Sequence, residues 1–96
     1  MIKVSTDQLS LIKQILKKYV PGAEIRVFGS RLEETIKKYS DLDLVIMGKK
    51  EIAPSIMVKI KSDFEESDLP FRVDILDWHK ISDEFKKVIT KKYEVL

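Results

Sequence analysis

The residues that the sequence lacks limit the kinds of site it can form, because its 96 positions include no cysteine and a single histidine. Without cysteine, disulfide bonds and thiolate metal sites are excluded, and one histidine is too few for a zinc site. No apolar run approaches the roughly 20 residues of a membrane-spanning helix. The first five residues also lack the apolar region of a secretory signal, so we expect a cytoplasmic protein without a membrane segment.

The excess of positive charge is small as well, since the formal net charge is +2, and it does not by itself indicate nucleic-acid binding. Four lysines gather near the C-terminus, and we interpret them as a solvated helix face; they are Lys86, Lys87, Lys91 and Lys92. Hydrophobic residues make up 44% of the chain and charged residues 35%, which is typical of a globular protein. This length has room for one modest core, so we expect a single domain over residues 1–96.

Four helices are predicted from capping residues and from apolar residues at helical spacing. Residues 5–8 read Ser-Thr-Asp-Gln, a capping box, and the helix that follows ends at residues 21–22, Pro-Gly. A second, short helix is expected at residues 31–38. Pro54 suits the first turn of a third helix, and Ser82 is a good N-cap for a fourth. In this last helix we expect Phe85, Val88 and Ile89 to turn inward.

Three strands are predicted between these helices from runs of β-branched and apolar residues, at residues 24–28, 42–47 and 71–76. The order of elements is therefore α-β-α-β-α-β-α, which indicates an α+β fold. Two of the strands contain aspartate, although aspartate is depleted in strands. Side chains alternate between the two faces of a strand, so Asp41 and Asp43 share one face, and Asp74 points away from its apolar neighbours. If helices cover the apolar face, all three carboxylates project from the same open side.

Three carboxylates placed together would either take up protons or bind a cation. Two of them ~4 Å apart repel each other by about 4 kcal/mol at an effective dielectric constant of ~20. Carboxylate oxygens are ligands that Mg²⁺ prefers, together with phosphates of a substrate. We therefore expect Asp41, Asp43 and Asp74 to hold Mg²⁺. A pair of such ions would activate an attacking oxygen and stabilise a leaving one.

Gly29 and Ser30 lie at the turn between the first strand and the second predicted helix. Glycine lets the backbone approach a phosphate closely, and a helix N-terminus offers free N–H groups. The Ser30 hydroxyl can add a donor, and Arg31 could neutralise phosphate charge. Gly-Ser is also a common turn, so the dipeptide gains weight only from the Asp-Leu-Asp run at residues 41–43.

Three segments of the chain together resemble the nucleotidyltransferase superfamily that includes DNA polymerase beta and kanamycin nucleotidyltransferase. They are Val-Phe-Gly-Ser-Arg at residues 27–31, Ser-Asp-Leu-Asp-Leu-Val at 40–45 and Phe-Arg-Val-Asp-Ile-Leu at 71–76. The chain is most similar to the minimal nucleotidyltransferase (MNT) proteins, which contain little beyond this core. The resemblance implies a small mixed three-stranded sheet covered by helices on one face. It implies that Gly29 and Ser30 hold the nucleotide phosphates.

The resemblance also implies roles for the carboxylates, because in the family the paired aspartates hold two divalent ions and the third assists the attacking hydroxyl. These roles fall on Asp41, Asp43 and Asp74. The implied reaction is transfer of a nucleoside monophosphate from an NTP, here AMP from ATP, with release of pyrophosphate. MNT proteins are commonly paired with a helical HEPN protein as antitoxin and toxin. The implied acceptor is a tyrosine of the HEPN partner.

Two alternatives stay open at the level of the sequence. Residues 32–34 are Leu-Glu-Glu, where many relatives have a small or basic run with a second glycine, and this departure favours an inactive antitoxin that acts by binding alone. The other alternative is nucleotidylation of a small-molecule acceptor. The length leaves no room for an acceptor-binding domain, so we expect the chain to work in a homo- or hetero-oligomer.

Overall fold

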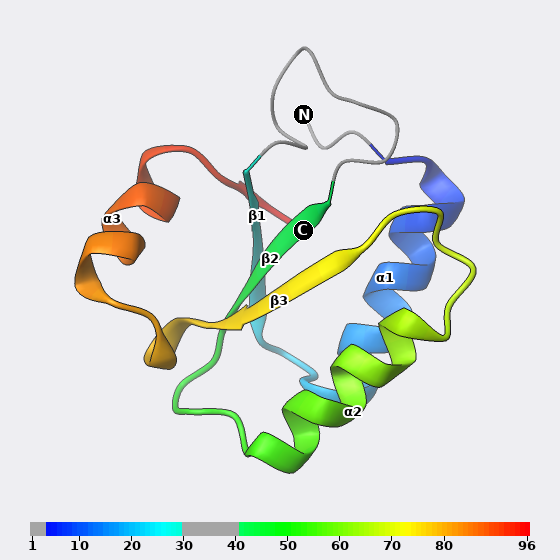
Figure 1. The fold of residues 1–96 in the computed structure, drawn as a ribbon, viewed down its shortest axis with the longest axis horizontal. Coiled ribbons are helices and arrows are strands. Elements are labelled where there is room, and N and C mark those ends of the chain that lie inside the picture. Colours follow the sequence, from blue (N-terminus) through cyan, green and yellow to red (C-terminus); the bar gives the residue numbers. More distant parts are fainter. Residues whose placement is uncertain (1–3, 30–40) are drawn as a thin grey trace.

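The computed structural model describes residues 4–29 and 41–96 and shows a mixed sheet with helices on both sides (Figure 1). The described elements are α1 (Thr6–Tyr19), β1 (Glu24–Phe28), β2 (Leu42–Met47), α2 (Pro54–Glu65), β3 (Val73–Asp77), the 3₁₀ helix η2 (Trp78–Lys80), α3 (Asp83–Lys91) and β4 (Glu94–Val95). The helix predicted at residues 31–38 lies outside the described residues. No helix within the described ranges is both long and apolar enough to cross a bilayer.

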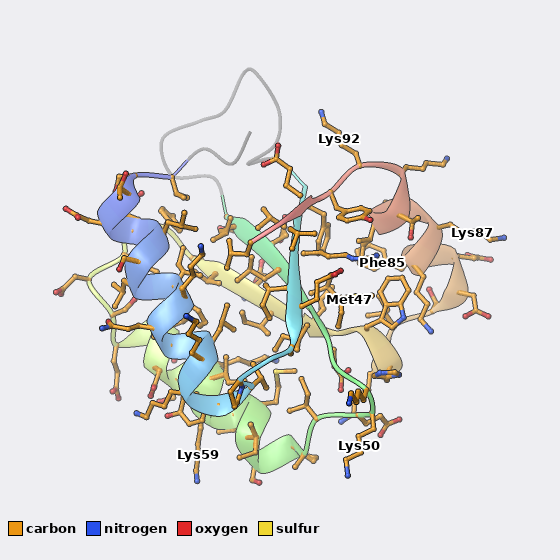
Figure 2. All side chains as sticks on the ribbon, turned by 180° about the vertical axis from the view of Figure 1, so that it is seen from behind. Met47, Lys50, Lys59, Phe85, Lys87 and Lys92 are labelled. Atoms are coloured by element: carbon orange, nitrogen blue, oxygen red, sulfur yellow. The ribbon has the colours of Figure 1, made fainter. Side chains whose placement is uncertain are left out.

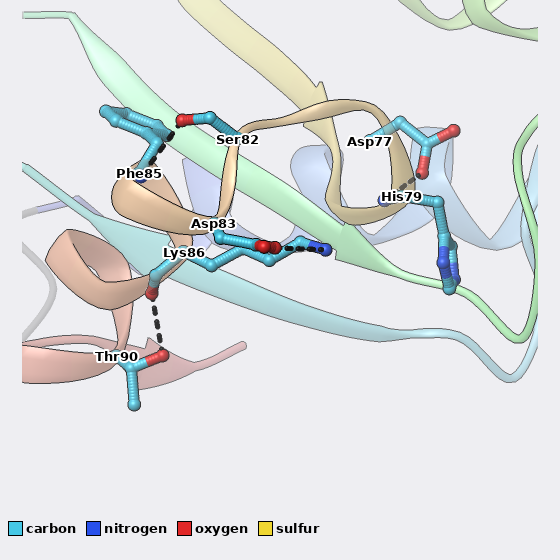
Figure 3. Close-up of polar contacts among 7 residues, drawn as sticks. All are labelled: Asp77, His79, Ser82, Asp83, Phe85, Lys86 and Thr90. Carbon is cyan, nitrogen blue, oxygen red and sulfur yellow. Dashed lines mark hydrogen bonds and ion pairs between the residues drawn. The ribbon is translucent and has the colours of Figure 1, made fainter.

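The three described α-helices begin where their capping residues predict. Ser5 and Gln8 form the predicted capping box: the Ser5 hydroxyl accepts from the Gln8 N–H at 3.1 Å, and the Gln8 side chain accepts from the Ser5 N–H at 2.9 Å. Pro54 occupies the first turn of α2, where its missing N–H costs nothing. Ser82 caps α3, and its hydroxyl accepts from the Phe85 N–H at 3.1 Å (Figure 3).

The sheet has the strand order β3-β2-β1-β4. Strands β1 and β2 are antiparallel, with Phe28 opposite Asp43, and β2 and β3 are parallel, with Asp43 opposite Asp74. The α+β class and the mixed sheet are therefore confirmed. The structure adds a fourth strand, β4, which pairs antiparallel with β1. Its two residues are too few for an alternating pattern to be detected in the sequence.

Two apolar cores lie on the two faces of this sheet. The larger core joins α1 and α2 to the sheet, and its fully buried members are Ile12, Val27, Leu42, Leu44, Ile46 and Ile60. The smaller core lies on the opposite face and is built on Phe28, Val45 and Ile89, with Phe85 packed against it. The helices were expected on one face only, whereas α3 covers part of the face that carries Asp43.

Helix α3 contacts the sheet along a narrow stripe. Phe85 and Ile89 are four residues apart and so share a side of the helix. The Phe85 ring meets the Phe28 ring edge to face, with centroids 5.7 Å apart. Val88 was expected to turn inward but is 57% exposed. The reason is that this helix of nine residues touches the sheet only on the side shared by Phe85 and Ile89.

Candidate active site

Gly29 ends β1 directly against the carboxylate of Asp43. Its φ angle is +82°, a left-handed conformation that glycine adopts without strain. A Cβ atom at this position would lie 2.3 Å from Oδ2 of Asp43, which is far inside van der Waals contact. Position 29 therefore requires glycine for two reasons: its left-handed backbone conformation, and the Asp43 carboxylate, which fills the space that a side chain would need.

Asp43 stands at the centre of the acidic group. It lies opposite Asp74 in the parallel ladder of β2 and β3, where neighbouring strands are about 4.8 Å apart. Asp41 precedes β2 by one residue and is close enough to Asp43 to repel it electrostatically. The structure thus brings three of the predicted site residues, Gly29, Asp41 and Asp74, next to the fourth, Asp43. Ser30 and Arg31, the other two, lie outside the described residues.

The electrostatic state of Asp43 reflects this crowding. The pKa of its carboxyl group is raised from 3.8 to about 6, chiefly by burial and in the same direction by the negative charges of Asp74 and Asp41. Negative charge at this position is therefore costly unless a cation compensates it. This is the electrostatic setting in which a carboxylate gains most from binding a divalent ion.

Asp74 is held from the solvent side by an arginine. The Nε atom of Arg72 lies 3.1 Å from Oδ1 of Asp74, and the side chains are 76% and 39% exposed. Exposed ion pairs contribute little to stability, so this pair mainly limits the directions in which the Asp74 carboxylate points. The Asp74 side chain also lines the groove described below.

Asp77 lies at the other end of β3, and its side chain points to the opposite face of the sheet from Asp43 and Asp74. Its carboxylate is 4% exposed on the side of α2 and accepts from the Ile52 N–H at 2.8 Å and the His79 N–H at 3.0 Å. The second of these bonds is drawn in Figure 3. Asp77 therefore fixes the segments before α2 and after β3, as its place at the strand end, with the opposite facing, predicts.

A groove of about 680 Å³ opens beside the carboxylates. Asp43 and Asp74 lie on its wall together with the aromatic rings of Phe28 and Phe85. Further lining residues come from α2 and from the loop before β3, and they are Lys61, Phe64, Glu65, Leu69, Phe71 and Arg72. Sequence reasoning missed these residues. Phe28 and Arg72 stand inside the quoted segments 27–31 and 71–76 and could have been found there, whereas Lys61 has no such signal.

The carboxylates fit a magnesium site that is completed by a substrate. Within residues 4–29 and 41–96, no three His, Cys, Asp or Glu side chains are already arranged to hold a metal ion. Mg²⁺ needs only one or two carboxylates when phosphates supply further oxygens, and Asp43 with Asp74 meets that requirement. The assignment of two ions to Asp41, Asp43 and Asp74 stays a prediction.

Comparisons with known proteins agree with this geometry. The family model described as "Polymerase beta, Nucleotidyltransferase" matches residues 10–96. The chain is 40% identical over 95 residues to the "Probable protein adenylyltransferase MntA" of Haemophilus influenzae, across 99% of this chain and 83% of that protein. A crystal structure described as that of a "putative nucleotidyltransferase" is 26% identical with a TM-score of 0.52, and the match covers 95% of this chain and 99% of the other.

Proposed function

Because the chain belongs to the polymerase beta family of nucleotidyltransferases, we propose that it transfers AMP from ATP to a hydroxyl group of a partner protein. The observation that carries the proposal is the placement of Asp43 between Gly29 and Asp74. A loop that admits phosphates and a pair of carboxylates beside an open groove are the parts that nucleotidyl transfer needs. The name of the Haemophilus influenzae relative supports a protein as the acceptor.

The reaction consists of one displacement at the α-phosphorus of ATP. The acceptor oxygen forms a bond to this phosphorus, and the bond from the phosphorus to the oxygen that bridges to the β-phosphate breaks. Pyrophosphate leaves with the electron pair of that bond, and the hydroxyl proton passes to a carboxylate. Asp74 is the proton acceptor in this proposal, because it is partly exposed and lines the groove.

Binding of the nucleotide is assigned to the end of β1 and the residues after it. Gly29 lets the backbone turn directly beside the Asp43 carboxylate, Ser30 adds a hydroxyl donor and Arg31 adds positive charge. Asp41, Asp43 and Asp74 would hold two Mg²⁺ ions, which neutralise phosphate charge when bound. Asp43 gains most from such a cation, because its own surroundings disfavour its charge.

The partner in this proposal is a helical HEPN toxin that is modified on a tyrosine, with the present chain as its antitoxin in the cytoplasm. The family resemblance supports this pairing, and the name of the relative supports the adenylyl group. The competing function is an antitoxin that blocks its partner by contact alone, which the Glu33-Glu34 departure favours. A small-molecule acceptor is the third candidate.

The test is transfer of label from α-³²P-ATP with Mg²⁺ to a co-purified partner protein. We expect the Asp41→Ala/Asp43→Ala variant to lose at least about 100-fold in rate, since it removes charge stabilisation at the reacting phosphate. Asp7→Asn is the matched control, because Asp7 lies in the first turn of α1 on the far face of the sheet. A stable complex without label from any NTP would support the contact-only antitoxin instead. Label on a small molecule without a partner would support the third candidate.

A further inference from the structure

Strand β3 leaves one edge of the sheet free within residues 4–29 and 41–96, because β2 is its only neighbour among the described strands. The Arg72 carbonyl accepts from the Leu42 N–H at 2.8 Å. In a parallel ladder alternate residues bond to the neighbouring strand, so Asp74 also directs its backbone groups toward β2. Val73 and Ile75 therefore direct their N–H and C=O groups outward, toward the free edge. These outward groups can pair with an added strand.

A groove accompanies this edge along most of its length. The cavity beside Asp74 continues on the α2 side into a second cavity of about 370 Å³, and the two share the residues Lys61, Ile75 and Leu76. Val58 lines the second cavity and is 65% exposed. Proteins usually protect an edge strand with proline, bulges or short length. Residues 73–77 are five in number and contain no proline, so this edge is open to pairing.

The order of the strands decides from which side an acceptor approaches. Gly29, directly after β1, lies against Asp43 on β2, and Asp74 on β3 lies on the other side of Asp43. In phosphoryl transfer the attacking and leaving oxygens lie roughly in line. With the nucleotide phosphates on the Gly29 side, the acceptor hydroxyl has to arrive from the β3 side. That side holds the free edge and its groove.

Successive side chains of a strand point to opposite faces of the sheet, which fixes where the neighbours of the acceptor residue lie. In a strand added to β3, the residue beside Asp74 points to the same face as the Asp74 side chain. The residue next to it in sequence points to the other face, where Ile75 packs with α2. Lys61 of α2 stands there and lines both cavities. Its ammonium group has no ion pair or hydrogen bond with any residue in the described ranges.

We propose that the acceptor protein binds as an extended segment along the free edge of β3, with an acidic residue directly next to the modified hydroxyl residue. The backbone of the segment pairs with Val73 and Ile75, its hydroxyl lies beside Asp74, and its acidic side chain meets Lys61. Charge complementarity with Lys61, which has no ionic partner among the described residues, identifies this occupant. The inference rests on the proposed adenylyl transfer, whose substrate class it specifies.

The first test compares three synthetic peptides of about seven residues, a usual strand length. Each has a central tyrosine among apolar β-branched residues, and the residue after the tyrosine is glutamate, glutamine or lysine. We expect the glutamate peptide to have the lowest KM, by about tenfold against the lysine peptide. In the Lys61→Glu variant the preference should reverse toward the lysine peptide, while the KM for ATP changes little.

Lys59→Glu is the matched control, because Lys59 is an exposed residue on the same helix that lines neither cavity and points to solvent (Figure 2). It should retain the wild-type order of the peptides. Equal KM values for the three peptides, or a higher KM for ATP in Lys61→Glu, would overturn the inference and leave adenylyl transfer intact. If the wild type labels no peptide and no partner protein, the proposed function fails as well.

The second test does not depend on catalysis. A peptide with phenylalanine in place of the tyrosine is added at saturation, and amide hydrogen exchange is followed by NMR. We expect the N–H groups of Val73 and Ile75 to exchange at least about tenfold more slowly, because an added strand pairs them. The N–H of Asp74 already faces β2 and serves as the internal reference. Unchanged exchange at Val73 and Ile75 would overturn strand addition.

Discussion

Gly29 is the residue at which the smallest change has the largest expected effect. Gly29→Ala adds a methyl group against Oδ2 of Asp43 at a φ of +82°. The left-handed backbone alone costs an alanine about 1 kcal/mol, and the displaced carboxylate adds to it. We expect the free energy of unfolding to fall by about 2 kcal/mol and AMP transfer to fall at least about tenfold. Urea denaturation and the label assay measure these two effects.

Gly22→Ala separates the cost of the left-handed backbone from the cost of displacing the Asp43 carboxylate. Gly22 has a φ of +80°, and a Cβ at this position would meet nothing within 4 Å. This variant should therefore show the backbone cost of about 1 kcal/mol without loss of transfer. Equal losses of stability and activity in both variants would contradict the contact between Gly29 and Asp43.

Asp43 gives a prediction for stability as a function of pH. Folding raises its pKa from 3.8 to about 6, so the folded protein binds the proton more tightly than the unfolded one. The stability linked to this proton is present below pH ~4 and is lost as the pH rises toward ~6. Asp43→Asn cannot ionise, and we expect it to be more stable than the wild type at pH 8 by about 1 kcal/mol after allowance for solvent screening.

Thermal melting at pH 4 and pH 8 measures this difference, which corresponds to roughly 4–8 °C at pH 8. At pH 4 the wild type is protonated at Asp43 and the two melting temperatures should converge. Asp68→Asn, at an exposed position in the loop before β3, is the control for a general effect of removing negative charge. A wild type that is the more stable protein at pH 8 would show that Asp43 is not crowded by charge.

At the scale of elements, we expect the two aspartates of β3 to differ, with Asp77 needed for stability and Asp74 for the proposed transfer. Asp77→Ala removes the acceptor of the Ile52 and His79 N–H groups, and an unsatisfied buried donor costs about 1–3 kcal/mol. Asp74→Ala removes a partly exposed side chain and should change stability by less than about 1 kcal/mol while abolishing transfer. Denaturation of both variants, beside the label assay, measures the contrast. Loss of stability in Asp74→Ala comparable with that of Asp77→Ala would contradict it.

The elements differ in how far the sequence predicts them. The capping box at Ser5, Pro54 and the Ser82 cap are local signals, and all three were confirmed because a cap depends on residues within one turn. The exposed Val88 and the strand β4 were not predicted. Both depend on where the C-terminal residues meet β1 and the far face of the sheet, which no local pattern encodes.

At the scale of the whole molecule, nucleotide and metal should stabilise the fold by binding to the folded state alone. At a concentration of MgATP ten times its dissociation constant, the gain is about 1.4 kcal/mol. For a domain of this size the melting temperature should rise by roughly 6–11 °C. The Asp41→Ala/Asp43→Ala variant should show no such rise, and EDTA should reduce it in the wild type. Calorimetry measures both, and a full shift in the double variant would place the metal elsewhere.

The sequence by itself determined the family, the α+β class and the acidic residues, because these depend on residue types at fixed spacing and on the alternation of strands. It also predicted that Asp74 and Asp77 face opposite sides of the sheet, as the structure shows. Only the tertiary structure decided that Gly29 lies against Asp43, that α3 shares the face of the carboxylates, and that β3 is the edge strand beside Lys61 in the described part of the sheet. Strand order and helix placement are set by packing between residues far apart in the chain, and a local pattern carries no information on such contacts.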